Sequence, residues 1–347
     1  MTAFWRIPNT DPGFPPPDWV QPFLELDAEW NAGRAVGRTS GSTGTPKSVA
    51  FDPAAVRASA HATAIHFGLN TNSDTPIQAW SALPALGVGG RMMWWRTRIL
   101  GWTLTQSRPS TSPMVPEPAA GERHDFAVAT PQQAAAMAQT GQLRKIRILL
   151  LGGGAVSPSL ETALQSAGLQ AQCQVHLGFG MTETLTHVAT RPLGEPVYTL
   201  LPGVTWSADA DGGLLLDAPE RGVHALHTRD AAEAATTASG SPGFRWLGRL
   251  DDVINTGGLK VHPTELEGAL DPLVEPHLDG RRWYVAGRPH PTTGEQVTLV
   301  VEGEADAQQA DRLLAAVAQG HPHSDRPRAV VWMARFEETG TGKVVRR

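Results

Sequence analysis

The sequence predicts an α/β protein with a large layered amino-terminal domain and a smaller α+β carboxy-terminal domain. An apolar strand, a glycine or proline turn and a helix follow one another between residues 126 and 183, and a similar alternation restarts after residue 251. The chain of 347 residues also exceeds the usual size of a single hydrophobic core. We therefore expect domains at 1–250 and 251–347, with ligands at the carboxyl ends of the strands of the larger one.

The elements before residue 126 are predicted from prolines, helix caps and apolar spacing. Pro8, Pro12 and the proline run at 15–17 make the start an extended lead-in. Asp52 and Pro53 are the residue types of a helix N-cap and a first helical position. We expect a docking helix at 19–30, a strand at 48–51, a helix from Pro53 to Phe67, helical packing of the Met- and Trp-rich run 89–102, and a loop over 103–122.

The central and carboxy-terminal elements follow from the same signals. Strands are expected at 126–129 and 146–151, the second stopped by Gly152, Gly153 and Gly154, and Ser157-Pro158 begins a helix. A third strand, glycine turn and helix are expected around 175–183, small β elements at 203–217 and a surface loop at 231–243. The second unit is predicted to hold a helix from Pro263, strands near 283–287 and 297–302, a helix at 305–318 and a strand at 329–333.

Residues 39–47, which read TSGSTGTPK, have the composition of a phosphate-binding loop. Small residues let backbone N–H groups approach an anion closely, hydroxyl side chains add donors, and the lysine supplies a positive charge. The loop is not a Walker P-loop, because Pro46 stands where that motif requires glycine. The alternative interpretation is a flexible Ser/Gly/Thr linker that ends in lysine. We expect Thr39, Ser40, Gly41, Ser42, Thr43, Gly44 and Lys47 to surround phosphate groups.

This loop and three later segments resemble the motifs of the adenylate-forming superfamily, which includes acyl-CoA synthetases, adenylation domains and luciferases. The later segments occur in the family's order: GFGMTET at 178–184, GRLDDVI at 248–254 with GGLKV at 257–261, and TGTGKV at 339–344. Family members usually carry a longer region before the phosphate loop, so the sequence resembles a shortened version. The resemblance implies that ATP, Mg²⁺ and CoA are used and that the small domain is mobile.

The resemblance assigns roles to individual residues of this sequence. Glu183 is implied as the magnesium ligand, Thr182 as a donor to the α-phosphate, and Phe179 as a ring face for adenine. Lys47 and Lys343 are implied as catalytic cations, with Lys343 bridging the acyl carboxylate and the α-phosphate. The nucleotide is further expected to contact Gly153, Gly154, Gly180, Met181, Asp230, Arg249, Gly257 and Gly258, the last two near the thiol tunnel.

Two of these assignments depart from the motif or concern movement. Asp230 lies in the sequence His227-Thr228-Arg229-Asp230, where relatives read T-G-D, so Arg229 replaces a glycine. Asp251 is implied as the hinge that absorbs the backbone rotation between the two half-reactions. A carboxylate is already a nucleophile at pH 7, so such an enzyme needs positioning and charge neutralisation rather than a general base.

The acid is indicated by the segment GMTETLTH at 180–187, which resembles the 2-succinylbenzoate–CoA ligases of menaquinone synthesis. Thr186 and His187 are polar residues just past Glu183, and Arg91 and Arg96 are placed by position alone to meet a second carboxylate. We therefore expect an aromatic carboxylic acid as substrate, namely 2-succinylbenzoate, converted to 2-succinylbenzoyl-CoA. The alternatives are another aryl- or acyl-CoA ligase, or a nucleotide-binding module without turnover.

Composition excludes several other classes of function. The net charge of −5, without a run of Lys or Arg, argues against nucleic acid as a partner. The single cysteine, Cys173, cannot form an internal disulfide and has no metal-ligand spacing. We find neither a signal pattern nor an apolar run of the ~18 residues that would span a bilayer. These features predict a cytoplasmic enzyme, and the family resemblance implies a homodimer that accepts free CoA.

Overall fold

The computed structural model describes residues 5–7, 17–38, 48–69, 75–154, 156–210, 212–337 and 344–346. The predicted phosphate loop and the carboxy-terminal lysine loop lie outside the described residues. The roles of Thr39, Ser40, Gly41, Ser42, Thr43, Gly44, Lys47 and Lys343 therefore remain predictions.

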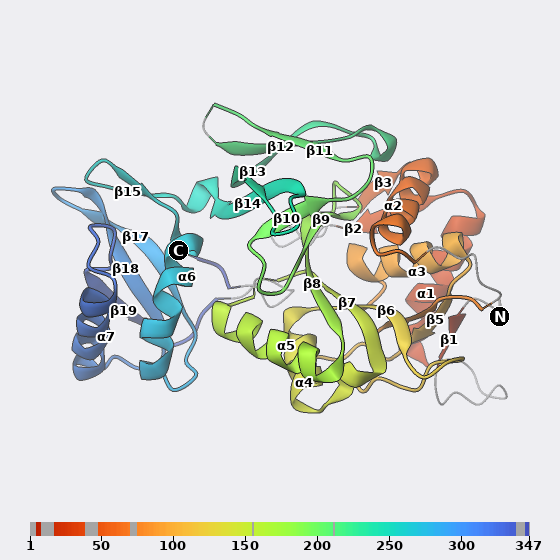
Figure 1. Cartoon of the computed structure of the whole chain (residues 1–347), viewed down its shortest axis with the longest axis horizontal. Coiled ribbons are helices and arrows are strands. Elements are labelled where there is room, and N and C mark those ends of the chain that lie inside the picture. The colour runs from red at the N-terminus through yellow and green to blue at the C-terminus, as the bar shows by residue number, and fades with distance from the viewer. Residues whose placement is uncertain are drawn as a thin grey trace.

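The described residues before 250 build a twelve-stranded sheet, and helices cover it (Figure 1). The half that begins at β1 is parallel through β8, and the strands from β9 onward pair antiparallel. In spatial order the strands are β1 (Trp5–Arg6), β5 (Thr103–Gln106), β4 (Gln78–Ser81), β6 (His124–Ala129), β7 (Ile146–Leu151), β8 (Gln174–Met181), β9 (Thr186–Pro192), β10 (Val197–Leu200), β14 (Pro242–Arg249), β13 (Val223–Thr236), β12 (Gly213–Ala218) and β11 (Thr205–Ala208). A separate hairpin pairs β2 (Ala35–Arg38) with β3 (Ser48–Phe51).

Two hydrophobic cores lie on opposite faces of the parallel strands. Successive residues of β7 alternate between them, since Leu149 and Leu151 belong to one core and Ile148 and Leu150 to the other. The first core includes residues of α4 (Pro131–Gln139) and α5 (Pro158–Ala171), and the second includes residues of α1 (Gln21–Asn31), α2 (Pro53–His66) and α3 (Val88–Leu100). A strand that is apolar on both faces is typical of a parallel sheet covered on both sides.

Helix starts are fixed by the caps that the sequence indicates. The Asp52 carboxylate accepts a hydrogen bond from the N–H of Ala54 at 2.8 Å, and the Ser157 hydroxyl accepts one from Leu160 at 3.2 Å. Thr130 and Gln133 form a capping box at the start of α4. Each cap precedes a proline, which lacks the N–H that would go unsatisfied in the first turn. The predicted helix starts at Pro53 and Pro158 are confirmed.

A second sheet of five strands follows the last strand of the first. Its path is β16 (Leu259–Val261), β15 (Ile254–Thr256), β18 (Gly294–Glu302) and β17 (Trp283–His290), with β19 (Ala329–Met333) parallel to β18. Helices α6 (Pro263–Val274) and α7 (Ala307–Gly320) pack on it around a third core. The first sheet ends at Arg249 and the second begins at Ile254. The α/β fold class predicted from the sequence is confirmed.

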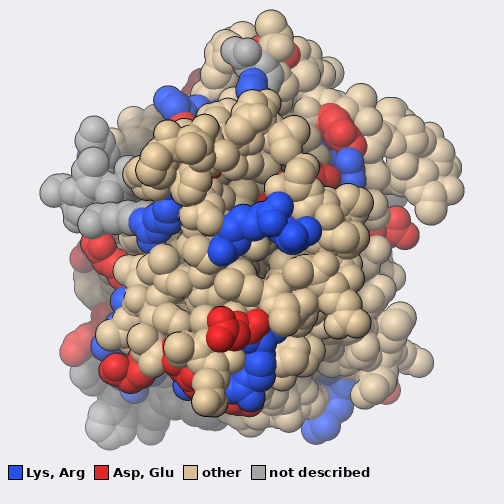
Figure 2. All heavy atoms as spheres, turned by 90° about the vertical axis from the view of Figure 1, so that its left-hand side faces the viewer, with Lys and Arg blue, Asp and Glu red and all other residues tan. Residues whose placement is uncertain are grey.

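Figure 2 shows the face of the molecule on the side of this second sheet. A short band of basic side chains crosses the middle of the face, and acidic side chains lie around it among uncharged surface. This face therefore carries charges of both signs. Among the described residues, no helix combines the length and the apolar character that crossing a bilayer requires.

Two local predictions are wrong, and a third is wrong only where β5 occupies its start. The helix predicted around 175–183 does not form, because β8 extends to Met181 and the chain turns back at 182–185 into the antiparallel strand β9. The predicted loop at 231–243 is largely strand, since β13 and β14 pair along it, and the loop at 103–122 begins with β5. In each case pairing with distant strands outweighs local composition.

The pairing of β14 with β10 explains one of its small residues and generates a stability prediction. A Cβ atom added at Gly243 would lie 2.1 Å from the backbone oxygen of Tyr198, which cannot move without disturbing the sheet. We expect Gly243→Ala to lower the free energy of unfolding by about 1–3 kcal/mol in urea denaturation. The control is Gly268→Ala within α6, where a Cβ meets nothing within 4 Å, and it should raise stability by about 0.5–1 kcal/mol. Equal effects of the two substitutions would contradict the packing argument.

Candidate active site

The carboxyl end of β7 lies beside β8, because the two strands are parallel and Leu151 pairs with Leu177, after which β8 continues to Met181. After β7 the backbone continues through Gly152, Gly153 and Gly154, all exposed. A Cβ at either of the first two would meet nothing within 4 Å, and Gly153 has a φ of +80° that favours glycine. The backbone after β7 is therefore open to close approach by a ligand.

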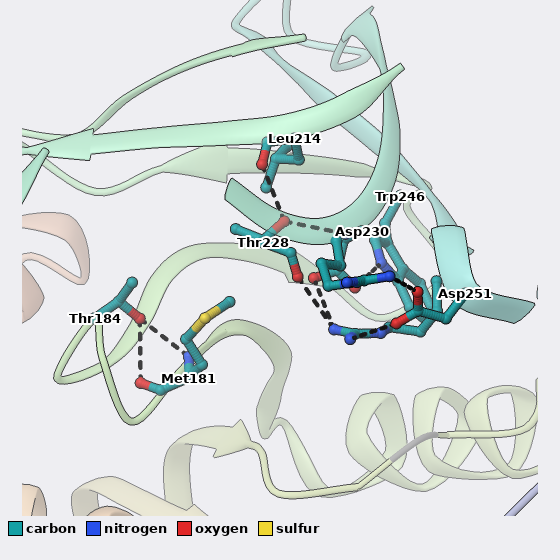
Figure 3. A network of polar contacts seen from close by, with 9 residues as sticks. Met181, Thr184, Leu214, Thr228, Asp230, Trp246 and Asp251 are labelled. Atoms are coloured by element: carbon teal, nitrogen blue, oxygen red, sulfur yellow. Dashed lines mark hydrogen bonds and ion pairs between the residues drawn. The ribbon is translucent and has the colours of Figure 1, made fainter. Parts of the chain in front are cut away.

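The turn between β8 and β9 carries Thr182 and the exposed Glu183. Thr184 holds this turn, since its hydroxyl accepts a hydrogen bond from Met181 N–H at 3.0 Å (Figure 3). The same hydroxyl donates a hydrogen bond to Thr186 O at 2.7 Å. Leu185 and Thr186 both have positive φ, +55° and +74°, which is unfavourable for residues with a Cβ. Two residues with strained backbone thus shape the turn that exposes Glu183, the predicted magnesium ligand.

Phe179 is held in place by an aromatic cluster. Its ring makes edge-on contacts with Tyr198 at 5.8 Å and Phe244 at 5.2 Å between centroids, while the residue stays partly exposed. A ring that is held in this way keeps a fixed orientation toward the strand ends. This arrangement is compatible with the predicted stacking of a nucleotide base.

Asp230, on β13, is the centre of a polar network (Figure 3). The side chain is buried, and its carboxylate accepts a hydrogen bond from Trp246 Nε1 at 3.0 Å and contacts Arg249 Nη1 at 3.5 Å. The Thr228 hydroxyl accepts a hydrogen bond from the Asp230 N–H at 3.2 Å and donates one to Leu214 O at 3.1 Å. These partners hold the carboxylate in place before any ligand arrives.

Arg249 connects this network to the predicted hinge. Its Nη1 also donates to Thr228 O at 3.2 Å, and its Nη2 lies 3.5 Å from Asp251 Oδ2. The structure therefore brings Asp230, Arg249 and Asp251 together. Their roles at a nucleotide and at a hinge remain predictions. Gly257 and Gly258 form a separate two-residue turn between β15 and β16, with φ of +56° and +87°.

The two arginines proposed for the acid have different surroundings. Arg91 Nη1 forms an ion pair with Glu29 Oε2 at 2.9 Å, and its Nε donates to Ala85 O at 2.9 Å. Arg96 is 1% exposed, and its Nε and Nη2 have no hydrogen-bond partner within the described part of the chain. Among the described residues its Nη1 reaches the sulfur of Met93 at 3.9 Å, and its guanidinium lies 5.8 Å from the Phe126 ring centroid. Arg91 already has a counter-charge, so Arg96 is the better candidate for binding an anion.

Arg96 belongs to a buried basic cluster that also contains Arg221, His187 and His66. Burial lowers the pKa of Arg96 to about 9, and the charge of Arg221 adds to this effect. Burial likewise lowers the pKa of Arg221 to about 10, although the carboxylate of Glu220 opposes the change. The pKa of His187 falls well below its usual value through burial and through the charges of Arg96, Arg221 and His66. Because buried positive charges lower the pKa values of Arg96 and His187 here, a bound anion would be strongly stabilised.

Hydrogen bonds tie the cluster to α2 and β9. Thr63 Oγ1 lies 3.3 Å from His187 Nε2, His66 Nε2 lies 2.6 Å from the Thr190 hydroxyl, and Arg221 Nη1 donates to His187 O at 3.1 Å. Thr186 Oγ1 lies 3.4 Å from His187 Nδ1. The two polar residues predicted after Glu183 thus connect the magnesium turn to the basic cluster.

Sequence reasoning missed Arg221, His66 and Trp246. Arg221 stands alone on a short 3-10 helix (Pro219–Arg221), and nothing in its neighbourhood marks it as buried. His66 lies in the last turn of α2, and no motif or spacing in the sequence distinguishes it from an ordinary helix residue. For Trp246, the alternation of strand β14 is the only available signal, and it does not reveal a partner sixteen positions away.

The fold and these residues define a nucleotide-dependent enzyme, and comparison with known proteins specifies the family. The AMP-binding enzyme family model matches residues 36–222, more than half of the chain, and the chain belongs to this family. It is an AMP-forming acyl-CoA ligase of the adenylate-forming superfamily.

Three relatives show how the similarity is distributed. The 2-succinylbenzoate–CoA ligase of Listeria monocytogenes is 25% identical over 95% of this chain and 72% of its own. An AMP-forming acyl-CoA synthetase-like protein from Dyadobacter fermentans has a crystal structure with 27% identity and a TM-score of 0.61, covering 96% of this chain and 94% of its own. The o-succinylbenzoate CoA synthetase of Bacillus subtilis shares the fold with a TM-score of 0.68 at 21% identity, over 90% of this chain and 67% of its own.

The described residues fit the ligands that this family implies. Open backbone after β7, an exposed carboxylate at Glu183 and the positioned carboxylate of Asp230 provide complementary groups for a base, a hard cation and sugar hydroxyls. Within the described ranges, no group of three or more His, Cys, Asp or Glu side chains could hold a metal on its own. A magnesium ion here would depend on the phosphates of ATP for further oxygen ligands.

The buried histidines generate a prediction for stability against pH. Burial lowers the pKa of His176 to about 4, with a contribution from His66. The unfolded chain binds a proton on this side chain near pH 6.5 and the folded chain does not, so folding stability falls as the pH drops from about 6.5 toward 4. His176→Leu should remove a pH-dependent loss of up to about 3 kcal/mol, measured as urea unfolding between pH 7.5 and 4.5.

The matched control is His61→Leu at an exposed position of α2, which should leave the pH dependence unchanged. A wild-type stability that stays constant down to pH 5 would contradict the burial of neutral histidines.

Proposed function

We propose that this ligase activates 2-succinylbenzoate with ATP and transfers the acyl group to CoA, the reaction of menaquinone synthesis. The observation that carries the choice of acid is the buried Arg96, which lacks a counter-charge among the described residues and lies beside Arg221 and His187. A monocarboxylic acid needs a single carboxylate-binding subsite, next to the phosphates. A second, interior cationic site indicates an acid with a second carboxylate.

The nucleotide half of the site is proposed to work by positioning. Asp230 would accept the ribose hydroxyls, Phe179 would stack on adenine, and Thr182 would donate to the α-phosphate. Magnesium ion bound near Glu183 would supply charge neutralisation for the triphosphate. The pre-organised Asp230 supports this proposal, because Trp246 and Arg249 hold it without any ligand present.

The two lysines outside the described residues complete the proposed mechanism. Lys47 would bind the β- and γ-phosphates, and Lys343 would bring the acyl carboxylate to the α-phosphate. The carboxylate oxygen attacks the α-phosphorus, the bond to the bridging oxygen breaks, and pyrophosphate leaves. The CoA thiol then attacks the acyl carbon and AMP leaves, after the small domain has rotated about Asp251.

Pyrophosphate release across a panel of acids tests the proposal. The panel contains 2-succinylbenzoate, benzoate, short fatty acids and amino acids, each with ATP and Mg²⁺, with and without CoA. We expect turnover with 2-succinylbenzoate and a thioester product that requires CoA. Lys343→Ala should reduce ATP–pyrophosphate exchange by about a hundredfold or more, since a positioned cation at the reacting phosphate is lost.

Turnover with another acid would retain the ligase chemistry and overturn the choice of substrate. Absence of turnover with every acid, while ATP still binds, would favour a nucleotide-binding module instead.

A second prediction isolates the carboxylate subsite. Arg96→Met removes the buried charge and keeps the length of the side chain, so KM for 2-succinylbenzoate should rise about tenfold to a hundredfold while KM for ATP stays constant. Thermal stability should not fall, because an unpaired buried charge is removed.

Arg91→Met is the matched control on the same helix. It breaks the ion pair with Glu29 and should lower stability without a selective effect on KM for the acid. If Arg91→Met and Arg96→Met changed KM equally, the assignment of Arg96 would be wrong.

A further inference from the structure

Arg229 occupies a backbone position that favours glycine. Its φ is +59°, in the left-handed region where a side chain is disfavoured, and the corresponding position of the family motif is glycine. The strand β13 is irregular here, since its register with β14 shifts between Ala231 and Ala232. An arginine at this position strains the backbone. We therefore looked for a role of its side chain that would offset this strain.

The side chain of Arg229 forms an ion pair with Asp251, the predicted hinge residue. Arg249 Nη2 lies 3.5 Å from the other carboxylate oxygen, so two arginines bracket one hinge carboxylate. Both arginines belong to the large sheet, on β13 and β14, whereas Asp251 lies in the short connection (Leu250–Asp252) between the two sheets. The bracket therefore joins the large domain to the segment about which the small domain would turn.

Arg249 also forms an ion pair with the buried Asp230, with 3.5 Å between Arg249 Nη1 and Asp230 Oδ2. The direction of the Asp251 carboxylate depends on the backbone angles of Asp251, which are the angles that a hinge changes. A large rotation at Asp251 would withdraw its carboxylate from both arginines. The present orientation of the small domain is further supported by Arg245 Nη1, which lies 3.7 Å from Glu265 Oε1 on α6.

We propose that Arg229 is a positioning residue that latches the hinge, stabilising one orientation of the small domain over the other. This inference rests on the proposed function, because it assigns the two orientations to the two half-reactions. The latch is an ion pair between partly exposed groups, so it shifts the balance between orientations by a modest factor and still permits rotation. Arg229 acts through Asp251 and touches no reacting atom.

The first test separates the half-reactions in Arg229→Gly. Glycine relieves the positive φ, so the variant should fold at least as stably as the wild type. Adenylation is measured as ATP–pyrophosphate exchange with 2-succinylbenzoate, and thioester formation as a single turnover of preformed acyl-adenylate with CoA. We expect the two rates to change by about two- to fivefold in opposite directions, because the orientation that the latch favours loses population to the other.

Two further variants serve as controls. Arg229→Lys keeps the positive charge and should restore the wild-type ratio of the two rates in part. Arg147→Ala removes an exposed ion pair with Asp125, 3.4 Å long, at the far ends of β6 and β7, and should leave the ratio unchanged. Rates that fall together, or do not change, in Arg229→Gly would overturn the latch.

A second readout does not depend on the substrate. Cysteines introduced at Ser239 and Glu304, both exposed, place one label on the β13–β14 turn and one on the small domain before α7. The native Cys173 is buried, and burial raises the pKa of its thiol to about 12, so it will not compete for a maleimide label. Energy transfer between the labels should shift in Arg229→Gly and stay unchanged in Arg147→Ala.

The two readouts distinguish failure of the proposed function from failure of the latch. If no acid supports exchange but energy transfer shifts, the proposed reaction is wrong and the latch stands. If exchange occurs and energy transfer is identical in the wild type and Arg229→Gly, the latch is wrong and the reaction stands.

Discussion

The contact between Gly180 and the backbone of Thr186 is the constraint on which the site depends. A Cβ at Gly180 would lie 2.0 Å from Thr186 O, so the approach is open to glycine alone. It occurs where the pairing of β8 with β9 shifts register, directly before the turn that carries Thr182 and Glu183. There the sheet changes from parallel to antiparallel pairing. The strands that follow bring Asp230 and Arg249 to the same sheet as the open ends of β7 and β8.

Electrostatics divides this site into two parts with different requirements. The nucleotide part holds Asp230 and Arg249, whose opposite charges lie together, so it is largely balanced before a ligand binds. The interior part holds Arg96, Arg221 and His187, and burial lowers the pKa of each of them. The burial of two guanidinium groups, with the charge of Arg221 acting on Arg96, makes the second part unfavourable until an anion enters. A dicarboxylic acid would supply that anion and leave its other carboxylate for the chemistry.

Much of the fold was predictable because local signals and tertiary packing agree. Asp52-Pro53 and Ser157-Pro158 begin helices in the structure, and residues 329–333 form the predicted strand. The failures have a common cause. The helix expected around 175–183 and the loop expected at 231–243 were inferred from composition, but pairing with antiparallel strands decides both.

The site was predictable where motifs recur in the family and not where packing alone creates it. Motifs placed Asp230, Arg249 and Asp251 among the candidate residues, the structure brings them together, and Arg229 adopts a positive φ that favours glycine. Arg221 and Trp246 could not be found, since their roles depend on burial and on partners that no short motif encodes. Arg91 and Arg96 look alike in the sequence, and only the structure shows which has a counter-charge.

The central claim is that the interior basic cluster recognises a second carboxylate on the acid. The most direct measurement is calorimetric binding of 2-succinylbenzoate and of 3-benzoylpropionate, which keeps the reacting carboxylate and lacks the one on the ring, to the wild-type enzyme with a non-hydrolysable ATP analogue. Binding of 2-succinylbenzoate that is at least about tenfold tighter would support the claim, as expected for a buried charge-assisted pair. Equal affinities would contradict it.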